Sequence, residues 1–198
     1  MDMHVGLRPI DALLTRRSVG ALDDPAPSGG DLDLIIDAGL RAPDHGRLRP
    51  WRFVVIQGEA RKAFGAVLAQ AAKARDPANA DGLIERHRAW PLRCPLIIAM
   101  GAIVQAGHRI PETEQILSAG AAAMNMLNAV HMLSYGGMWV TGVNTYDAQV
   151  NAMLGFVAPS RLVGFLMVGT PKSPALAGER PSRAAHLTYW TSPTEGLR

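Results

Sequence analysis

The sequence predicts one domain in which α-helices and β-strands are interleaved along the chain. The chain has 198 residues, of which 48% are apolar and 19% charged, and this is enough for one sizeable core. Apolar residues recur at helical spacing in several segments. Short apolar runs bounded by Pro or Gly lie between these segments. No internal repeat or second domain is visible, so we expect a single domain over residues 1–198.

The helices are predicted from apolar periodicity and from residues that begin or end a helix. Ile10, Leu13 and Leu14 repeat at helical spacing in the first segment. Asp31 suits the start of a second helix, and Pro43 marks its end. The predicted helices span residues 10–17, 31–42, 60–71, 83–90, 111–134 and 149–154.

The strands are predicted from short runs rich in apolar residues. Pro50 and Gly58 bound the first run, and the run that begins at Pro95 is apolar throughout, as in a buried strand. The predicted strands span residues 53–56, 95–100, 138–141 and 162–168. Residues 23–30 and 76–82 are predicted to be loops, and the tail over residues 172–183 is predicted to be extended.

The longest predicted helix lies in a stretch from Gln115 to Tyr146 that contains no formal charge. Polar residues and a Gly-Gly pair interrupt this stretch, so it does not resemble a membrane span of about 20 apolar residues. A helix with almost no solvated face is buried on all sides. In a domain of this size the simplest such arrangement is a dimer interface, which predicts a homodimer.

Composition argues against several classes of function. The net charge of +3 is mild, and the basic residues are scattered, which disfavours nucleic acid as a partner. The single cysteine, Cys94, excludes an internal disulfide and is expected to be a small buried residue. No apolar leader follows Met1, so we expect a cytoplasmic protein. No His/Cys cluster has metal-ligand spacing, so no metal site is predicted.

Two short basic stretches are the strongest candidates for a ligand site. The first is Arg-Arg-Ser, and the second is Arg-Ala-Pro-Asp-His, which runs on to Pro50-Trp51. Guanidinium groups suit a phosphate or an electron-rich ring edge better than a core. The candidate residues, with those of a later aromatic strand, are Arg16, Arg17, Ser18, Arg41, His45, Trp139, Val140 and Thr141.

Each of these residues also has an ordinary structural explanation. Arg16, Arg17 and Arg41 could complement the dipoles of helices that end beside them. His45 could be a turn residue, and Trp139 could belong to the core. The histidines that are isolated in sequence are expected to be structural or solvated rather than catalytic: His87, His108, His131 and His186.

The order of these motifs resembles the nitroreductase family, most closely its short bacterial members of the YdjA type. Arg-Arg-Ser, Ala-Pro-Asp-His, Pro-Trp and a late Gly-Gly-Met-Trp strand occur at matching separations over nearly the whole chain. The resemblance implies an α+β fold with a central, mostly antiparallel sheet flanked by helices, forming an obligate homodimer with a long buried interface helix. It also implies FMN at the subunit interface and NADH or NADPH as the electron donor.

The resemblance further assigns roles by position. The segment Arg16–Ser18 would hold the FMN phosphate and ribityl chain or the pyrimidine edge. Arg41 and His45 would reach the flavin from the partner subunit, and the segment Trp139–Thr141 would line its other side. The chemistry implied is hydride transfer from NAD(P)H through flavin N5 to an electron-poor small molecule, such as a nitroaromatic or a quinone, by a ping-pong mechanism. No protein acid, base or nucleophile is then required, so no catalytic residue is assigned.

Some positions depart from the family, and some alternatives stay open. Arg47 and Arg49 stand where many members carry Asn and Gln, and they could favour an anionic substrate or face solvent. A basic C-terminal residue that binds phosphate in longer members has only candidate counterparts: Lys172, Arg180 and Arg183. The same scaffold could support enone reduction, dehalogenation or flavin-linked oxidation, or a flavin-binding module without turnover.

Overall fold

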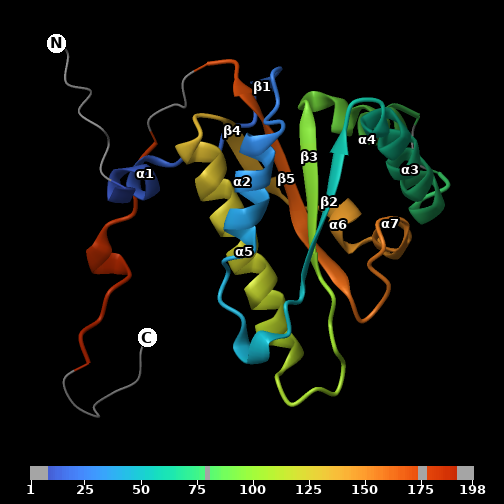
Figure 1. Ribbon diagram of the computed structural model, residues 1–198. Helices are drawn as coiled ribbons and strands as arrows, with labels where there is room; N and C mark the ends of the chain where they lie inside the picture. The colour runs from blue at the N-terminus through green and yellow to red at the C-terminus, as the bar shows by residue number, and fades with distance from the viewer. Residues whose placement is uncertain (1–8, 79–80, 174–177, 191–198) are drawn as a thin grey trace.

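The computed structural model describes residues 9–78, 81–173 and 178–190. In these residues five strands form one sheet with the order β1-β5-β3-β2, and β4 also pairs with β5 (Figure 1). Every pairing is antiparallel, which confirms the central antiparallel sheet. The strands are β1 Leu22–Asp23, β2 Trp51–Gln57, β3 Leu96–Ala102, β4 Gly136–Val140 and β5 Arg161–Pro171.

The middle of the sheet explains the continuous apolar run that begins at Pro95. Strand β3 lies between β2 and β5, and all of its residues are buried. Its side chains alternate between two cores: Ile97 and Ala99 pack on one face of the sheet, and Ile98 and Met100 pack on the other. A strand that is covered on both faces has no need of polar residues.

Helices cover both faces of this sheet (Figure 1). Helices α2 and α5 pack on one face through Ile35 and Met126, and α3 and α7 pack on the other through Leu68 and Val150. The α-helices are α1 Pro9–Thr15, α2 Gly30–Gly39, α3 Ala60–Arg75, α4 Asp81–Ala89, α5 Glu112–Met132, α6 Val143–Tyr146 and α7 Ala148–Met153. Three short 3₁₀ helices are η1 His45–Arg47, η2 Trp90–Arg93 and η3 Arg183–Ala185.

The long helix α5 is buried less completely in one chain than its sequence predicts. The sheet covers one side of α5, and α2 lies so close to it that a Cβ on Gly39 would stand 2.8 Å from Cγ of Met126. These contacts account for much of the uncharged body of the helix. Leu117 and Met132, however, are 66% and 52% exposed. Packing within one chain therefore leaves part of α5 uncovered.

Several predicted boundaries differ from those in the structure. Helix α1 ends at Thr15, so Arg16 and Arg17 follow the helix instead of completing it. Helix α4 begins at Asp81, which shortens the loop predicted over residues 76–82, and residues 79–80 lie outside the described part. In the predicted extended tail, residues 174–177 also lie outside it, and the short helix η3 begins at Arg183.

The single cysteine, Cys94, is buried just before β3. Cys94 is 2% exposed, and its burial raises the pKa of the thiol to about 11. The prediction of a small buried cysteine is therefore confirmed. Among the described residues, no helix combines the length and the hydropathy needed to cross a membrane.

Candidate functional site

The Arg-Arg-Ser segment lies beside β4. Directly after it, the backbone N–H of Val19 donates a hydrogen bond of 2.9 Å to the carbonyl of Gly137. The side chain of Met138 is so close to Gly20 that its Cε would stand 3.0 Å from a Cβ there. Two of the predicted site segments, which are more than a hundred residues apart in the chain, are thus brought together at one sheet edge.

Arg16 presents an unpaired positive group at this edge. Its Nη1 is buried and has no hydrogen-bond partner among the described residues. Nη2 of Arg180 donates a 2.6 Å hydrogen bond to the carbonyl of Arg16, so a second guanidinium lies alongside. Burial, and the charge of Arg180, lower the pKa of Arg16. A buried donor beside two positive charges is an arrangement that an anion would stabilise.

The C-terminal tail holds this arrangement together. Nη1 of Arg17 donates to the carbonyl of Gly178 at 3.2 Å, two residues before Arg180. Of the three basic residues considered for the tail, Arg180 is the one that contacts the Arg-Arg-Ser segment. Lys172 instead pairs with the carboxylate of Asp23 at 3.4 Å on the surface. Ser18 is exposed.

The charge of Arg16 also affects a histidine on α5. Oγ1 of Thr15 lies 3.1 Å from Nε2 of His131, which joins the end of α1 to the last turn of α5. Burial, followed by the charge of Arg16, lowers the pKa of His131. No ion pair joins Arg16 to a carboxylate in the part of the chain that the structure describes, so its charge is available to an anion.

At the other end of β4, the three predicted residues lie in different environments. The indole N–H of Trp139 donates to the carbonyl of Val163 at 3.2 Å, and the ring packs in the core. Gly164 makes room for it, since φ is 147° and a Cβ would lie 2.3 Å from Nε1 of Trp139. Val140 packs against the opposite core, and Thr141 is exposed. Trp139 therefore offers a ligand its main chain rather than its ring.

Thr141 lines a pocket of about 260 Å³. Val19, just after the Arg-Arg-Ser segment, pairs with Gly137, and Gly137 is about 13 Å from Thr141 at 3.3 Å per residue of extended strand. The edge of β4 therefore connects a positive site at one end to a pocket at the other. Such an arrangement suits an elongated ligand with an anionic group at one end.

The second basic motif lies elsewhere in the chain. Oγ of Ser118 donates to the carbonyl of Pro43 at 2.8 Å, and Nδ1 of His45 lies 2.6 Å from Oε2 of Glu114. Both contacts are at the N-terminal part of α5, whereas Thr15 contacts its C-terminal end at His131. At 1.5 Å per residue, these two ends of α5 are about 25 Å apart.

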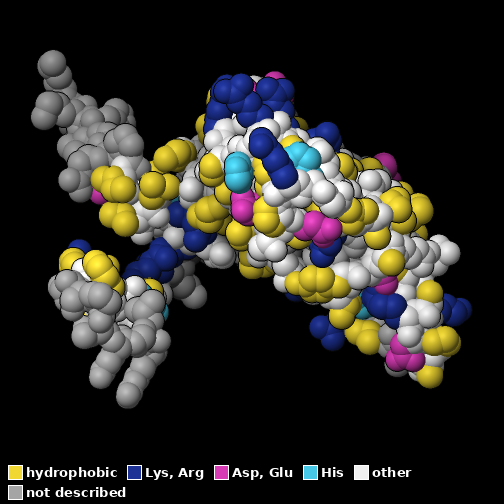
Figure 2. Space-filling model, turned by 90° about the horizontal axis from the view of Figure 1, so that it is seen from below, with side chains coloured by type: hydrophobic (Ala, Val, Ile, Leu, Met, Phe, Trp, Pro, Cys, Tyr) yellow, Lys and Arg dark blue, Asp and Glu magenta, His cyan; other side chains and the backbone are white. Residues whose placement is uncertain are grey.

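One chain therefore does not bring the two basic motifs together. Figure 2 views the molecule from the end at which η1 lies and shows Lys and Arg side chains gathered on part of this face. Arg41 and His45 are exposed, as are Arg47 and Arg49 of the segment between α2 and β2. Arg47 and Arg49 have φ values of 56° and 48°, in the left-handed region that disfavours side chains other than Gly and Asn.

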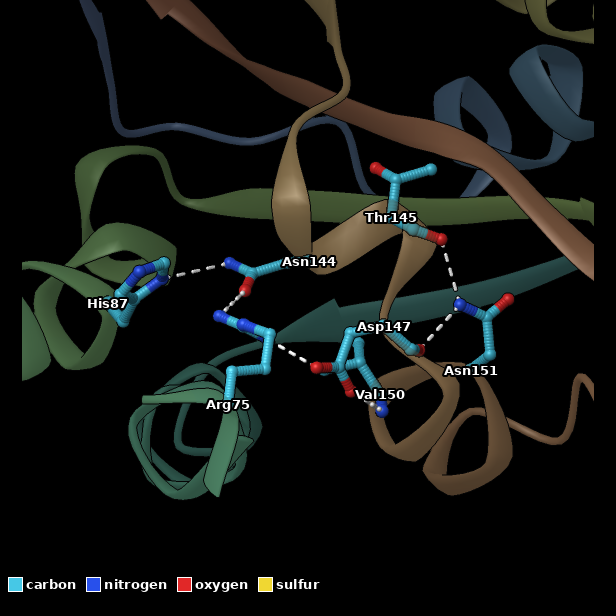
Figure 3. Close-up of polar contacts among 7 residues, drawn as sticks. All are labelled: Arg75, His87, Asn144, Thr145, Asp147, Val150 and Asn151. Atoms are coloured by element: carbon cyan, nitrogen blue, oxygen red, sulfur yellow. Dashed lines mark hydrogen bonds and ion pairs between the residues drawn. The ribbon is translucent and has the colours of Figure 1, made fainter. Parts of the chain in front are cut away.

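The structure adds a polar network that the sequence did not reveal. Figure 3 shows that side chains from α3, α4, α6 and the start of α7 join in a chain of contacts that includes Arg75, His87, Asn144 and Asp147. Its members are up to 72 residues apart. The one sequence signal was the basic character of the segment before Pro91.

Comparisons with known proteins agree with this architecture. The chain is 42% identical over 182 residues to "Putative NAD(P)H nitroreductase YdjA" of Escherichia coli K12, which covers 91% of this chain and 98% of that protein. The crystal structure of a nitroreductase-like family protein from Bacillus cereus matches with a TM-score of 0.80 at 19% identity, covering 95% of this chain and 98% of that one.

A nitroreductase from Bacteroides fragilis, crystallised with bound FMN, matches with a TM-score of 0.71 at 20% identity, and covers 93% of this chain and all of that one. At these identities the two solved structures show the fold. The sequence profile of the nitroreductase family matches residues 13–170, from α1 through most of β5. With this match and the extended likeness to the E. coli protein, the chain belongs to the nitroreductase family.

Proposed function

We propose that this protein is an FMN-dependent NAD(P)H oxidoreductase that reduces an electron-poor small molecule, such as a nitroaromatic or a quinone, by a ping-pong mechanism. The observation that carries the proposal is the buried Nη1 of Arg16, which has no hydrogen-bond partner in the described part of the chain and has Arg180 alongside. The name of the E. coli relative and the FMN in the B. fragilis structure support the same choice of cofactor and donor.

The residues at the edge of β4 fit FMN from end to end. Arg16, Arg17 and Arg180 would hold the phosphate, with the hydroxyl of Ser18 available on the same segment. The main chain of residues 139–141 would support the ring system at the other end of the strand. The spacing of about 13 Å between the two ends of this edge gives room for the ribityl chain between them.

When bound, FMN supplies the chemistry, because it accepts a hydride from NAD(P)H and passes two electrons to the acceptor. The protein's residues position the cofactor and set its electrostatic surroundings. The guanidinium groups would hold the phosphate, and the edge of β4 would support the ring system. Protons for the acceptor would come from solvent, and no residue of the chain is assigned a catalytic role.

We propose that the working unit is a homodimer in which Arg41 and His45 of one chain complete the site of the other. The separation of about 25 Å within one chain supports this, since it exceeds the length of about 13 Å proposed for the FMN site along β4. Uncovered apolar side chains support it too. They lie on α1 and α5 and are about half exposed or more: Ile10, Leu13, Leu14, Leu117 and Met132.

The same proposal places the protein in the cytoplasm, with a small molecule as its partner and with neither nucleic acid nor a membrane. A lone buried thiol is consistent with a reducing compartment.

The proposal predicts a yellow protein. Purified protein should contain FMN, and NADH or NADPH should bleach its visible absorbance under anaerobic conditions. Addition of a quinone or a nitroaromatic should restore the colour. Protein that is colourless and cannot be reconstituted with FMN would contradict the proposal, and so would bound flavin that neither nucleotide reduces.

A further inference from the structure

The pocket beside Thr141 has features that point to the kind of acceptor. It is formed by α4, η2, the segment after β4 and the buried ring of Phe165. Its lining includes Arg86, His87 and Arg93 but no Asp or Glu. We propose that this pocket binds the carboxylate of a single-ring aromatic electron acceptor. This inference rests on the proposed function, and it adds a substrate class to it.

The positive charge of the pocket is not neutralised. Arg86 and Arg93 form no ion pair or side-chain hydrogen bond with any described residue, whereas Arg88, on the same helix as Arg86, pairs with Glu85 at 2.9 Å. An anion that enters the pocket therefore meets two free guanidinium groups. Planar guanidinium donors match a carboxylate well in charge and in geometry.

The polar network fixes His87 as a neutral hydrogen-bond donor (Figure 3). Nη2 of Arg75 donates to Oδ1 of Asn144 at 3.2 Å, so the amide nitrogen of Asn144 is the group that lies 3.2 Å from Nδ1 of His87. An amide nitrogen can only donate, so Nδ1 accepts and the ring proton is on Nε2. Burial, then the charges of Arg75 and Arg86, lower the pKa of His87 and keep the ring neutral.

Asp147 holds this network in place. Its Oδ2 pairs with Nη1 of Arg75, and its Oδ1 accepts the backbone N–H of Val150 at 2.9 Å as the N-cap of α7. These bonds to the carboxylate outweigh the effect of its burial and keep the pKa of Asp147 low. Arg75 is thereby oriented before any ligand binds. Nε2 of His87 has no partner among the described residues and is left to donate to a ligand.

The apolar part of the pocket determines the shape and size of the rest of the ligand. Trp90 packs edge-on against Phe165, with ring centroids 5.4 Å apart, and both rings line the pocket. Aromatic side chains favour a flat ring as their neighbour. A volume of about 260 Å³ is below the roughly 300–1,000 Å³ of sites for drug-sized ligands, so one ring fits better than two. Thr141 would bring this ring close to the flavin.

The test compares a charged with a neutral acceptor in the oxidative half-reaction. Holoenzyme is first reduced under anaerobic conditions, and reoxidation of the flavin is then followed with 4-nitrobenzoate and with 4-nitrobenzamide. Each nitro group takes up two electrons from the reduced enzyme and two protons, and yields a nitroso group and water. We expect the second-order rate constant for the carboxylate to exceed that for the amide by about tenfold or more.

Four variants show whether the pocket is the origin of this preference. Arg86→Gln and Arg93→Gln should each lower the carboxylate-to-amide ratio, and the double variant should bring it close to one. Arg88→Gln, whose side chain pairs with Glu85 and does not line the pocket, should keep the wild-type ratio. Flavin content is measured for every variant, so that loss of cofactor is not mistaken for loss of preference.

The outcomes separate the two proposals. If wild-type enzyme binds FMN and is reduced by NAD(P)H but shows no preference for the carboxylate, the pocket inference is wrong and the proposed function stands. A preference that survives in the double variant likewise overturns it. Protein that binds no FMN contradicts the proposed function itself. As a check that needs no turnover, wild-type protein should bind benzoate more tightly than benzamide by calorimetry, and the double variant should not.

Discussion

At Arg16, a buried nitrogen that has no partner among the described residues, with a guanidinium beside it, supports the proposed anion site more directly than any motif in the sequence. Replacing Arg16 by Ala should weaken FMN binding, because a hydrogen bond to a charged group contributes about 1.5–3 kcal/mol, or tenfold and more in Kd. Arg180→Ala should weaken binding by a similar factor. Fluorescence titration of the apoprotein with FMN measures both effects.

Lys172 provides the control for this measurement. It belongs to the same tail, but its ammonium group lies against the carboxylate of Asp23 instead of the Arg-Arg-Ser segment. Lys172→Ala should therefore bind FMN as wild type does. Equal FMN affinity in the wild type and the Arg16→Ala variant would mean that the phosphate binds elsewhere. A loss confined to Lys172→Ala would assign the phosphate contact to that residue instead.

Single residues also show where sequence patterns stop being informative. The Arg-Arg-Ser and Ala-Pro-Asp-His motifs were visible because their residues are consecutive. His87 looked like an isolated histidine, because the groups that determine its proton position, Arg75 and Asn144, are distant in the chain and meet it only in the fold. For the same reason, nothing in the sequence distinguished the paired Lys172 from Arg180.

Among the elements, α5 ends in a turn that its sequence does not favour. The backbone N–H of Tyr135 donates to the carbonyl of Val130, and the backbone N–H of Ser134 donates to the carbonyl of His131, as in a Schellman motif. Ser134 has a φ of 66°, in the left-handed region where Gly is the preferred residue. Its side chain is exposed and makes no hydrogen bond with a described residue.

Ser134→Gly should therefore stabilise the protein by about 0.5–1 kcal/mol, because relief of the left-handed strain exceeds the added chain entropy of Gly. For a chain of this length, the melting temperature should rise by about 1–4 °C. Ser134→Ala is the matched control and should bring no gain, since Ala meets the same strain. Calorimetry measures the melting temperatures of the two variants. A fall in melting temperature for Ser134→Gly would contradict the predicted relief of strain.

Elements of high apolar periodicity were predictable, and elements fixed by tertiary contact were not. The strand around Ile98 and the helix that begins at Ala60 follow directly from their patterns. Strand β1 has two residues and exists because it pairs with the end of β5. Helix α6 is a single turn after Gly142. The missing charge on α5 was interpreted as burial in a dimer, but the sheet and α2 already account for much of it.

On the scale of the whole molecule, the two basic motifs are held apart by the length of α5. His131 lies beside the first motif, and Glu114 holds His45 of the second. Because α5 is a rigid spacer, small side-chain movements cannot bring Arg41 to the anion site of the same chain. In a dimer with two-fold symmetry, by contrast, each motif of one chain can meet the other motif of its partner, and both sites are completed at once.

This arrangement predicts complementation between two defective chains. If the site is shared, Arg16→Ala and Arg41→Ala homodimers should each bind FMN poorly. A heterodimer of the two variants carries both substitutions in one site and neither in the other. Random pairing of equal amounts makes half of the dimers heterodimers, so about a quarter of all sites should be intact. FMN content and NAD(P)H oxidation should rise to that fraction after the two variants are refolded together.

Each variant refolded alone is the control, and it should show no such gain. Purified heterodimers, isolated through a different tag on each chain, should bind one tightly held FMN per dimer. If Arg16 and Arg41 served the same site within one chain, every site in the heterodimer would contain one substitution and mixing would restore nothing. Lack of restoration in a verified heterodimer would therefore overturn the shared site, and a chain that sediments as a monomer while still binding FMN would do the same.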